Sequence, residues 1–155
     1  MKKIILLTTT ILCLSCGNKV LIDETKMFDN GCWMRFEPAE FKVDIDDIDD
    51  NYNIAVTLRY DTSIYTEKSL PLVVDYFADS NELRNFSSRV RLIDKKGHRR
   101  GELLGEYCTV SDTIDRYRMY NKAGTYTYRI KQKTPRYELY GITSFGLKIE
   151  KAKME

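Results

Sequence analysis

The stretch YNIAVTLRY, residues 52–60, carries the strongest structural signal in the chain. Every second residue from Tyr52 to Tyr60 is apolar, whereas Asn53, Thr57 and Arg59 lie on the other face. Successive side chains of a β-strand point to opposite faces of its sheet, so this alternation predicts a strand with one buried face.

The same alternation recurs in YTYRIKQ at 126–132 and in SFGLKIE at 144–150. Further strand candidates are FKVDI, LPLVVDYF and SRVRLID, and the turn-forming segments DKKG and NKAG separate some of them. No window shows a helical stripe, although a small helix or turn could occupy 80–85. Roughly eight short strands predict an all-β fold, an antiparallel two-sheet β-sandwich, with a single curved barrel as the alternative.

The N-terminus, MKKIILLTTTILCLSC, has the layout of a secretory signal peptide: two lysines, then about ten mostly apolar residues. This segment is shorter than the roughly 20 apolar residues that a membrane-spanning helix needs. Leu14 and Ser15 lead into Cys16-Gly17, which is similar to the lipobox of bacterial lipoproteins. That resemblance implies that the signal peptide, 1–15, is removed and that Cys16 is lipidated.

Two alternatives remain for the cysteines near the N-terminus. In an ordinary secreted protein Cys16 would be a free or bridged thiol, and Cys13 with Cys16 could also form a redox or zinc pair. The second alternative requires the apolar segment to be retained as core, so we favour lipidation.

The resulting organisation has three parts: a lipoprotein signal peptide at 1–15, a lipidated cysteine and tether at 16–30, and a single β-sandwich domain at 31–155. Several acyl chains would hold the domain firmly at a membrane surface. Residues 17–21 carry no acidic side chain, and so lack the acid-rich tag that follows the cysteine in some surface-exported lipoproteins. We therefore expect an outer-membrane lipoprotein, with the periplasmic face favoured.

The charge balance argues against nucleic acid as a partner. The chain has 25 Lys and Arg against 23 Asp and Glu, and Lys2 and Lys3 in the signal peptide account for the excess. A neutral mature protein lacks the basic surface that releases counterions from nucleic acid. The expected partners are the membrane, through the lipid anchor, and other envelope proteins.

Two further cysteines, Cys32 and Cys108, could form one disulfide in an oxidising compartment, or they could be two separate buried thiols. The sequence favours the separate thiols, because nothing in it places the two residues within bonding distance.

Residue types that carry catalysis or bind metals are sparse. His98 is the only histidine, which removes most zinc and catalytic-triad chemistry. The acidic segment DIDDIDDN, 44–51, fails the calcium-loop pattern at Tyr52, where the turn needs glycine. It is interpreted as a connector between strands, and DKKGHRRG, 94–101, as a charged hairpin tip that could dock an acidic partner or lipid head groups. We predict no enzyme, no cofactor and no metal.

Tyrosines are frequent, with eleven in the chain. Tyr126 and Tyr128 share a face with Ile130 and are predicted to be core residues. Tyr117, Tyr120 and Tyr137 lie outside the clean alternation and are the candidates for an exposed binding patch, because aromatic side chains contact sugars and protein partners well.

Several motifs follow one another along the chain: the lipobox cysteine, Trp33-x-x-Phe36, YNIAVTLRY, Asp94-x-x-Gly97-x-x-x-Gly101, AGTYTYRIKQ and YGITSFGLKIE. Their order resembles that of the gliding motility lipoprotein GldH family of Bacteroidetes. The resemblance covers most of the mature chain and is closest in the C-terminal block.

The resemblance implies an accessory, non-enzymatic envelope lipoprotein that is needed for surface gliding and linked to type IX secretion. The alternative function is a lipoprotein module that binds glycans or peptidoglycan fragments, with the tyrosine-rich region 117–140 as its platform.

Overall fold

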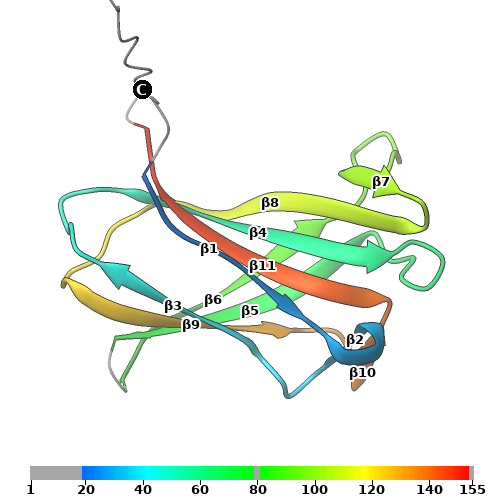
Figure 1. Ribbon diagram of the computed structural model, residues 1–155, viewed down its shortest axis with the longest axis horizontal. Coiled ribbons are helices and arrows are strands. Elements are labelled where there is room, and N and C mark those ends of the chain that lie inside the picture. The colour runs from blue at the N-terminus through cyan, green and yellow to red at the C-terminus, as the bar shows by residue number, and fades with distance from the viewer. Residues whose placement is uncertain (1–18, 79–80, 154–155) are drawn as a thin grey trace, which may run out of the picture.

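The structure, a computed structural model, describes residues 19–78 and 81–153 (Figure 1). The predicted signal peptide, 1–15, and Cys16 lie outside the described residues. Within them the chain forms eleven strands and one short 3-10 turn, and no α-helix occurs there. The elements are β1 (Val20–Met27), η1 (Asp29–Gly31), β2 (Cys32–Met34), β3 (Ala39–Ile45), β4 (Tyr52–Asp61), β5 (Ser69–Ala78), β6 (Asn81–Arg91), β7 (Glu102–Leu104), β8 (Tyr107–Arg118), β9 (Gly124–Gln132), β10 (Glu138–Tyr140) and β11 (Ile142–Lys151).

The strands form three sheets, and every pairing between neighbours is antiparallel. The first sheet has the order β1-β11-β4-β8-β7, the second sheet β3-β9-β5-β6, and the small sheet contains β10 and β2. The prediction of an all-β, antiparallel fold is confirmed. The predicted two-sheet sandwich is not confirmed, because β2 and β10 pair separately from the larger sheets and form a third sheet. The expected number of about eight strands is too low, since the described residues form eleven.

The alternating stretches form the centre of the fold, as their periodicity predicts. In β4 the side chains of Ile54, Val56 and Leu58 are fully buried, and β4 lies between β11 and β8 in the first sheet. The buried faces of the first and second sheets contribute to one continuous hydrophobic core. Figure 1 shows these two sheets as two layers.

The predicted tether at 16–30 is wrong for its second half. Residues Val20–Met27 form β1, which pairs with β11 from Val20 opposite Glu150 to Met27 opposite Ser144. Only Ile22 in β1 is buried. Because the strand has no continuous buried face, its sequence does not need alternating apolar residues and shows none. Its partner strand supplies the hydrogen bonds that make it a strand, and the folded domain therefore begins before residue 31.

Most local predictions between the strands agree with the structure. The acidic segment connects β3 to β4, and 94–101 forms a hairpin tip in which the Asp94 amide donates to the His98 carbonyl over 2.8 Å. The helix or turn expected at 80–85 is wrong, because Asn81–Asn85 belongs to β6 and pairs with β5.

Tyrosines form part of the core between the two layers. Tyr120 packs edge-on against Tyr52 and Tyr126, with ring centroids 5.5 and 4.7 Å away. Its hydroxyl lies 2.6 Å from that of Tyr128, so the two phenols share a hydrogen bond. Burial raises the pKa of Tyr120 to about 12, and burial also raises the pKa values of Tyr65 and Tyr128.

The buried tyrosines predict a loss of stability in alkaline solution. An unfolded tyrosine loses its proton near pH 10, whereas Tyr120, Tyr65 and Tyr128 keep theirs in the folded protein. The unfolded chain therefore binds fewer protons, and the free energy of unfolding falls as the pH rises from about 10 through 12. Urea unfolding at increasing pH, with tyrosinate absorbance, measures this. Simultaneous ionisation of all tyrosines near pH 10 in the folded protein would contradict it.

Candidate interaction surface

The small sheet lies at the end of the molecule opposite the start of β1 (Figure 1). β1 runs from Val20 to Met27, a length of about 24 Å. At its far end the Phe28 amide donates to the Thr143 carbonyl over 2.9 Å, and the Gly141 amide donates to the Gly31 carbonyl over 2.9 Å. We call the end that carries β2 and β10 the distal end, and the end at Lys19 the tether end.

Trp33 attaches the small sheet to the core. Its side chain is completely buried, and its ring stacks on Phe28 at a centroid distance of 4.8 Å and an angle of 17°. Phe145 packs against the ring with its centroid at 5.0 Å. The indole Nε1 donates a hydrogen bond of 2.8 Å to the Glu37 carbonyl, so both the apolar and the polar part of the side chain have partners.

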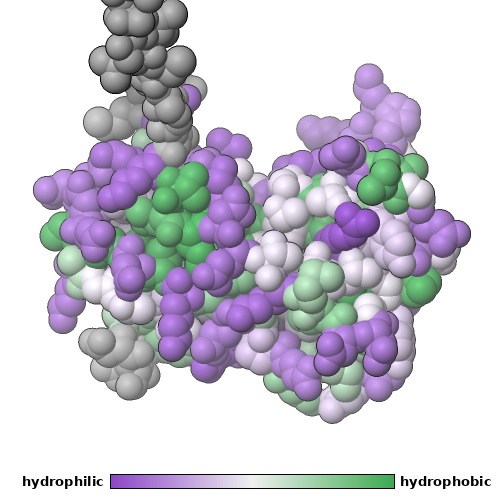
Figure 2. Space-filling view, in the orientation of Figure 1, coloured by the Kyte–Doolittle hydropathy of each residue, from purple (hydrophilic) through white to green (hydrophobic). Residues whose placement is uncertain are grey.

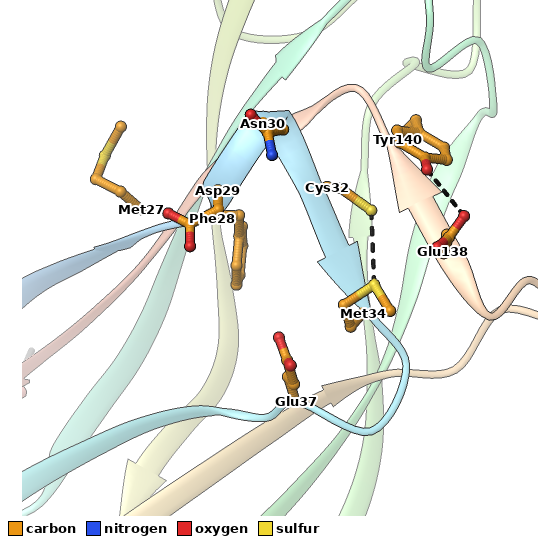
Figure 3. A pocket seen from close by; sticks show the side chains of 9 residues that line it. All are labelled: Met27, Phe28, Asp29, Asn30, Cys32, Met34, Glu37, Glu138 and Tyr140. Atoms are coloured by element: carbon orange, nitrogen blue, oxygen red, sulfur yellow. Dashed lines mark hydrogen bonds between the residues drawn. The ribbon is translucent and has the colours of Figure 1, made fainter.

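A depression of about 370 Å³ lies beside the small sheet (Figure 3). It contains three carboxylates and several sulfur-bearing side chains, and no lysine or arginine contributes to its wall. It is therefore an acidic, polarisable surface. Its walls are formed by Met27, Phe28, Asp29, Asn30, Cys32, Met34, Glu37, Glu138 and Tyr140.

Hydrogen bonds fix one side of this depression. The Tyr140 hydroxyl donates to Glu138 Oε2 over 2.8 Å, and this bond raises the pKa of Tyr140 (Figure 3). Burial, followed by the charge of Glu138, raises the pKa of the Cys32 thiol. A raised pKa keeps the thiol protonated at neutral pH, so Cys32 is a poor nucleophile.

A second depression, of about 320 Å³, lies on the other side of β10. Leu139 faces this depression, whereas its neighbours Glu138 and Tyr140 face the first one. An ion pair between Arg136 Nη2 and Glu67 Oε1, at 3.3 Å, lies in its wall. Because this pair is exposed, it contributes little to stability.

Large apolar side chains project into solvent at the distal end: Met27 and Tyr140 line the first depression, and Phe36 and Tyr137 flank the small sheet. Met27 and Phe36 are 72% and 74% exposed, and Tyr137 and Tyr140 are about half exposed. Phe36 and Tyr137 meet edge-on at 5.6 Å, and the Arg35 guanidinium lies 5.9 Å from the centre of the Phe36 ring. We call Met27, Phe36, Tyr137, Tyr140 and the first depression the distal surface.

The structure does not bring the predicted tyrosine patch together. Tyr137 is on the distal surface, but Tyr117 lies at the tether end, where its amide donates to Asn53 Oδ1 over 3.3 Å. Tyr120 is buried at 4% exposure, so its prediction as a contact residue is wrong. Sequence reasoning missed Met27 and Phe36 as surface contacts because neither lies in a periodic stretch.

Cys32 and Cys108 are both free thiols, so the possible disulfide is not formed; Cys108 is buried as predicted, whereas Cys32 is only partly buried. The Cys108 Sγ donates to the Arg100 carbonyl over 3.2 Å, and the Cys32 Sγ lies 3.8 Å from the Met34 Sδ. The described part of the chain contains no group of three or more His, Cys, Asp or Glu side chains placed to hold a metal ion.

These features define a class: an all-β protein that presents exposed aromatic and methionine side chains around an acidic depression. A family model for the GldH lipoproteins matches residues 20–149, so the chain belongs to the GldH lipoprotein family. The resemblance found in the sequence is thereby confirmed. No curated protein matches the chain.

Membership of a lipoprotein family implies a membrane anchor, and this family is not known for an enzymatic activity. Among residues 19–78 and 81–153, no helix is long and apolar enough to cross a bilayer.

Proposed function

We propose that this protein is a non-enzymatic, lipid-anchored interaction component of a complex associated with gliding and type IX secretion. Its distal surface is the partner-binding site in this proposal. The observation that supports it lies at the end of the molecule away from Lys19. There Met27 and Tyr140 line an acidic depression, and the exposed rings of Phe36 and Tyr137 pack against each other beside the small sheet.

The side chains of the distal surface are of the kinds that bind protein partners well. Aromatic residues and methionine are enriched at the centres of protein interfaces, where truncation of a few residues removes most of the affinity. Trp33 fixes the strands beneath them, so little ordering is required on binding. The carboxylates Asp29, Glu37 and Glu138 favour a partner segment that carries lysine or arginine.

The anchor in this proposal is Cys16, exposed as the first residue after removal of the signal peptide at 1–15. Two residues separate Cys16 from Lys19, where the described chain begins. The expected location is the outer membrane, with the periplasmic face favoured because residues 17–21 lack acidic side chains.

The proposal is tested by affinity purification of the tagged protein from mildly crosslinked outer membranes. We expect gliding or type IX secretion components to co-purify with the wild-type chain. Their recovery should fall at least about tenfold when Tyr137 and Tyr140 are both changed to serine, because two central aromatic contacts are lost. A Cys16→Ser chain should lose the recovery because it leaves the membrane.

The matched control changes Leu103 and Leu104 to serine, since these comparably exposed residues lie on β7, the edge strand of the first sheet, and not on the small sheet. An equal loss of recovery in the control and the tyrosine variant would contradict the assignment of the distal surface. Co-purification of polysaccharide or peptidoglycan without any such component would instead support the glycan-binding module predicted as the alternative.

A further inference from the structure

A second set of exposed apolar side chains lies at the tether end. Val20, Ile48, Tyr117 and Met119 are between 41% and 66% exposed. We call these four residues the tether-end rim. Figure 2 shows apolar side chains gathered beside the start of the described chain, with hydrophilic side chains around them.

Hydrogen bonds show that the rim belongs to one end of the molecule. The Lys151 amide donates to the Lys19 carbonyl over 2.8 Å, and the Ala152 amide donates to the Asn51 carbonyl over 2.7 Å. The Tyr52 hydroxyl donates to the Asp47 carbonyl, also over 2.7 Å, which holds the loop that carries Ile48. Tyr52 in turn packs on Tyr120, next to Met119.

A β-bulge directs Tyr117 outward. Tyr52 pairs with Arg118 but Ile54 pairs with Asp115, so two residues of β8 lie opposite one residue of β4. Tyr117 has φ 55°, a left-handed conformation that is rare for a bulky side chain. Bulges reorient side chains, and backbone strain of this kind is often kept where a side chain has a function.

The backbone beneath the rim is firmly held. The Arg118 side chain is buried, pairs with Asp115 and donates to the Tyr76 hydroxyl over 3.2 Å. The Tyr126 hydroxyl donates to the Lys122 carbonyl over 2.9 Å, on the other side of Met119. The exposed positions of Tyr117 and Met119 are thus fixed by buried contacts on both sides.

Charges at the tether end are mixed. Asp46, Asp47 and Asp49 lie in the loop between β3 and β4, and Asp50 forms an ion pair with Lys151. Cationic residues at this end include Lys19, Lys122, Lys153 and Arg116. A rim without a dominant sign suits zwitterionic lipid headgroups better than a strongly charged partner.

The position of Cys16 indicates what covers this rim. Three residue steps join Cys16 to Lys19, so even a fully extended chain spans at most about 11 Å. A lipidated Cys16 would therefore hold the tether end close to the bilayer. Tyrosine is enriched at the interface between lipid and water, where its ring is apolar and its hydroxyl is hydrated.

We propose that the tether-end rim inserts into the headgroup region of the bilayer, so that the domain rests on the membrane by this end. The inference depends on the proposed lipidation of Cys16. The distal surface then faces away from its own membrane, about 24 Å above it, the length of β1.

Two methionines of similar exposure provide the test. Met119, on the rim, and Met27, on the distal surface, are 66% and 72% exposed. Each is changed to tryptophan in the full lipidated chain, which is then reconstituted in phosphatidylcholine vesicles with brominated acyl chains. The native Trp33 is buried at the distal end, and its emission is the same background in every variant. We expect the bromolipid to quench more than half of the emission added by Met119→Trp, and little of that added by Met27→Trp.

A Tyr117→Trp chain gives a second rim position in case Met119→Trp folds poorly. Equal quenching of rim and distal tryptophans, or no quenching of either rim tryptophan on vesicles that carry the protein, would overturn the orientation and leave the anchor intact. If the wild-type chain floats with vesicles no better than Cys16→Ser, the anchor itself is wrong and the rim proposal falls with it.

Discussion

Replacing Trp33 by alanine is expected to lower the free energy of unfolding by about 3–5 kcal/mol. The substitution removes a completely buried ring that contacts Phe28 and Phe145, and it removes the donor to the Glu37 carbonyl. Urea unfolding followed by circular dichroism measures the change, since the only tryptophan is lost. The small sheet should loosen with it, so recovery of partners through the distal surface should also fall.

Trp33→Phe is the matched control. It keeps an aromatic ring between Phe28 and Phe145 but loses the indole N–H, so its effect should be smaller than that of Trp33→Ala. A loss below about 1 kcal/mol for Trp33→Ala would show that the small sheet does not depend on this side chain.

Replacing Gly101 by alanine should be the second large perturbation, with a loss of about 3 kcal/mol in the free energy of unfolding. Gly101 has φ 93°, and a Cβ there would lie 2.3 Å from the Thr109 carbonyl oxygen. That oxygen belongs to the backbone of β8 and cannot move without disturbing the first sheet. Urea unfolding measures the loss, and tryptophan fluorescence can follow it because Trp33 is intact.

Gly97→Ala separates the strain of the left-handed backbone conformation from the steric clash with β8. Gly97 also has a positive φ, 87°, but a Cβ there meets no atom within 4 Å. Its substitution should cost only the strain of the left-handed conformation, about 1–2 kcal/mol. Similar losses of unfolding free energy for Gly101→Ala and Gly97→Ala would mean that the β8 backbone can move aside and that the clash at Gly101 costs little.

The sequence predicts strands well where one face of the strand is buried and the other is not. β4, β9 and β11 show this pattern because each has neighbours on both sides and packs one face against the core. The sequence misses β8, because Asp112 interrupts its apolar side. The Asp112 carboxylate lies 3.0 Å from Arg100 Nη1, and this ion pair makes a charged residue acceptable there.

Edge and short strands escape prediction for a different physical reason. β1 has one buried residue, Ile22, and is a strand because β11 offers it a complete row of hydrogen-bonding groups. β2 and β10 have three residues each, too few to show any period, and Trp33 rather than an alternating pattern fixes them. The number of sheets therefore could not be deduced from periodicity.

The candidate site was only partly predictable. Tyr137 is an exposed residue of the distal surface, as expected, but the sequence cannot show that Tyr117 lies at the opposite end of the first sheet. Tyr120 lies outside the strands yet is buried, because Tyr52 and Tyr126 enclose its ring. Met27 and Phe36 are far from Tyr137 and Tyr140 in the sequence, and only the fold brings all four residues to the same end of the molecule.

The pairing of β1 with β11 also determines how the protein responds to mechanical force. If Cys16 is fixed in a membrane and the distal surface holds a moving partner, tension enters the fold along the axis of β1. The hydrogen bonds between antiparallel strands lie perpendicular to that axis, so tension loads the seven residue pairs of β1 and β11 together, in shear. Strands pulled in this direction do not separate one pair at a time. In that case the first strand of the chain would act as a mechanical clamp between the anchored N-terminus and the rest of the domain.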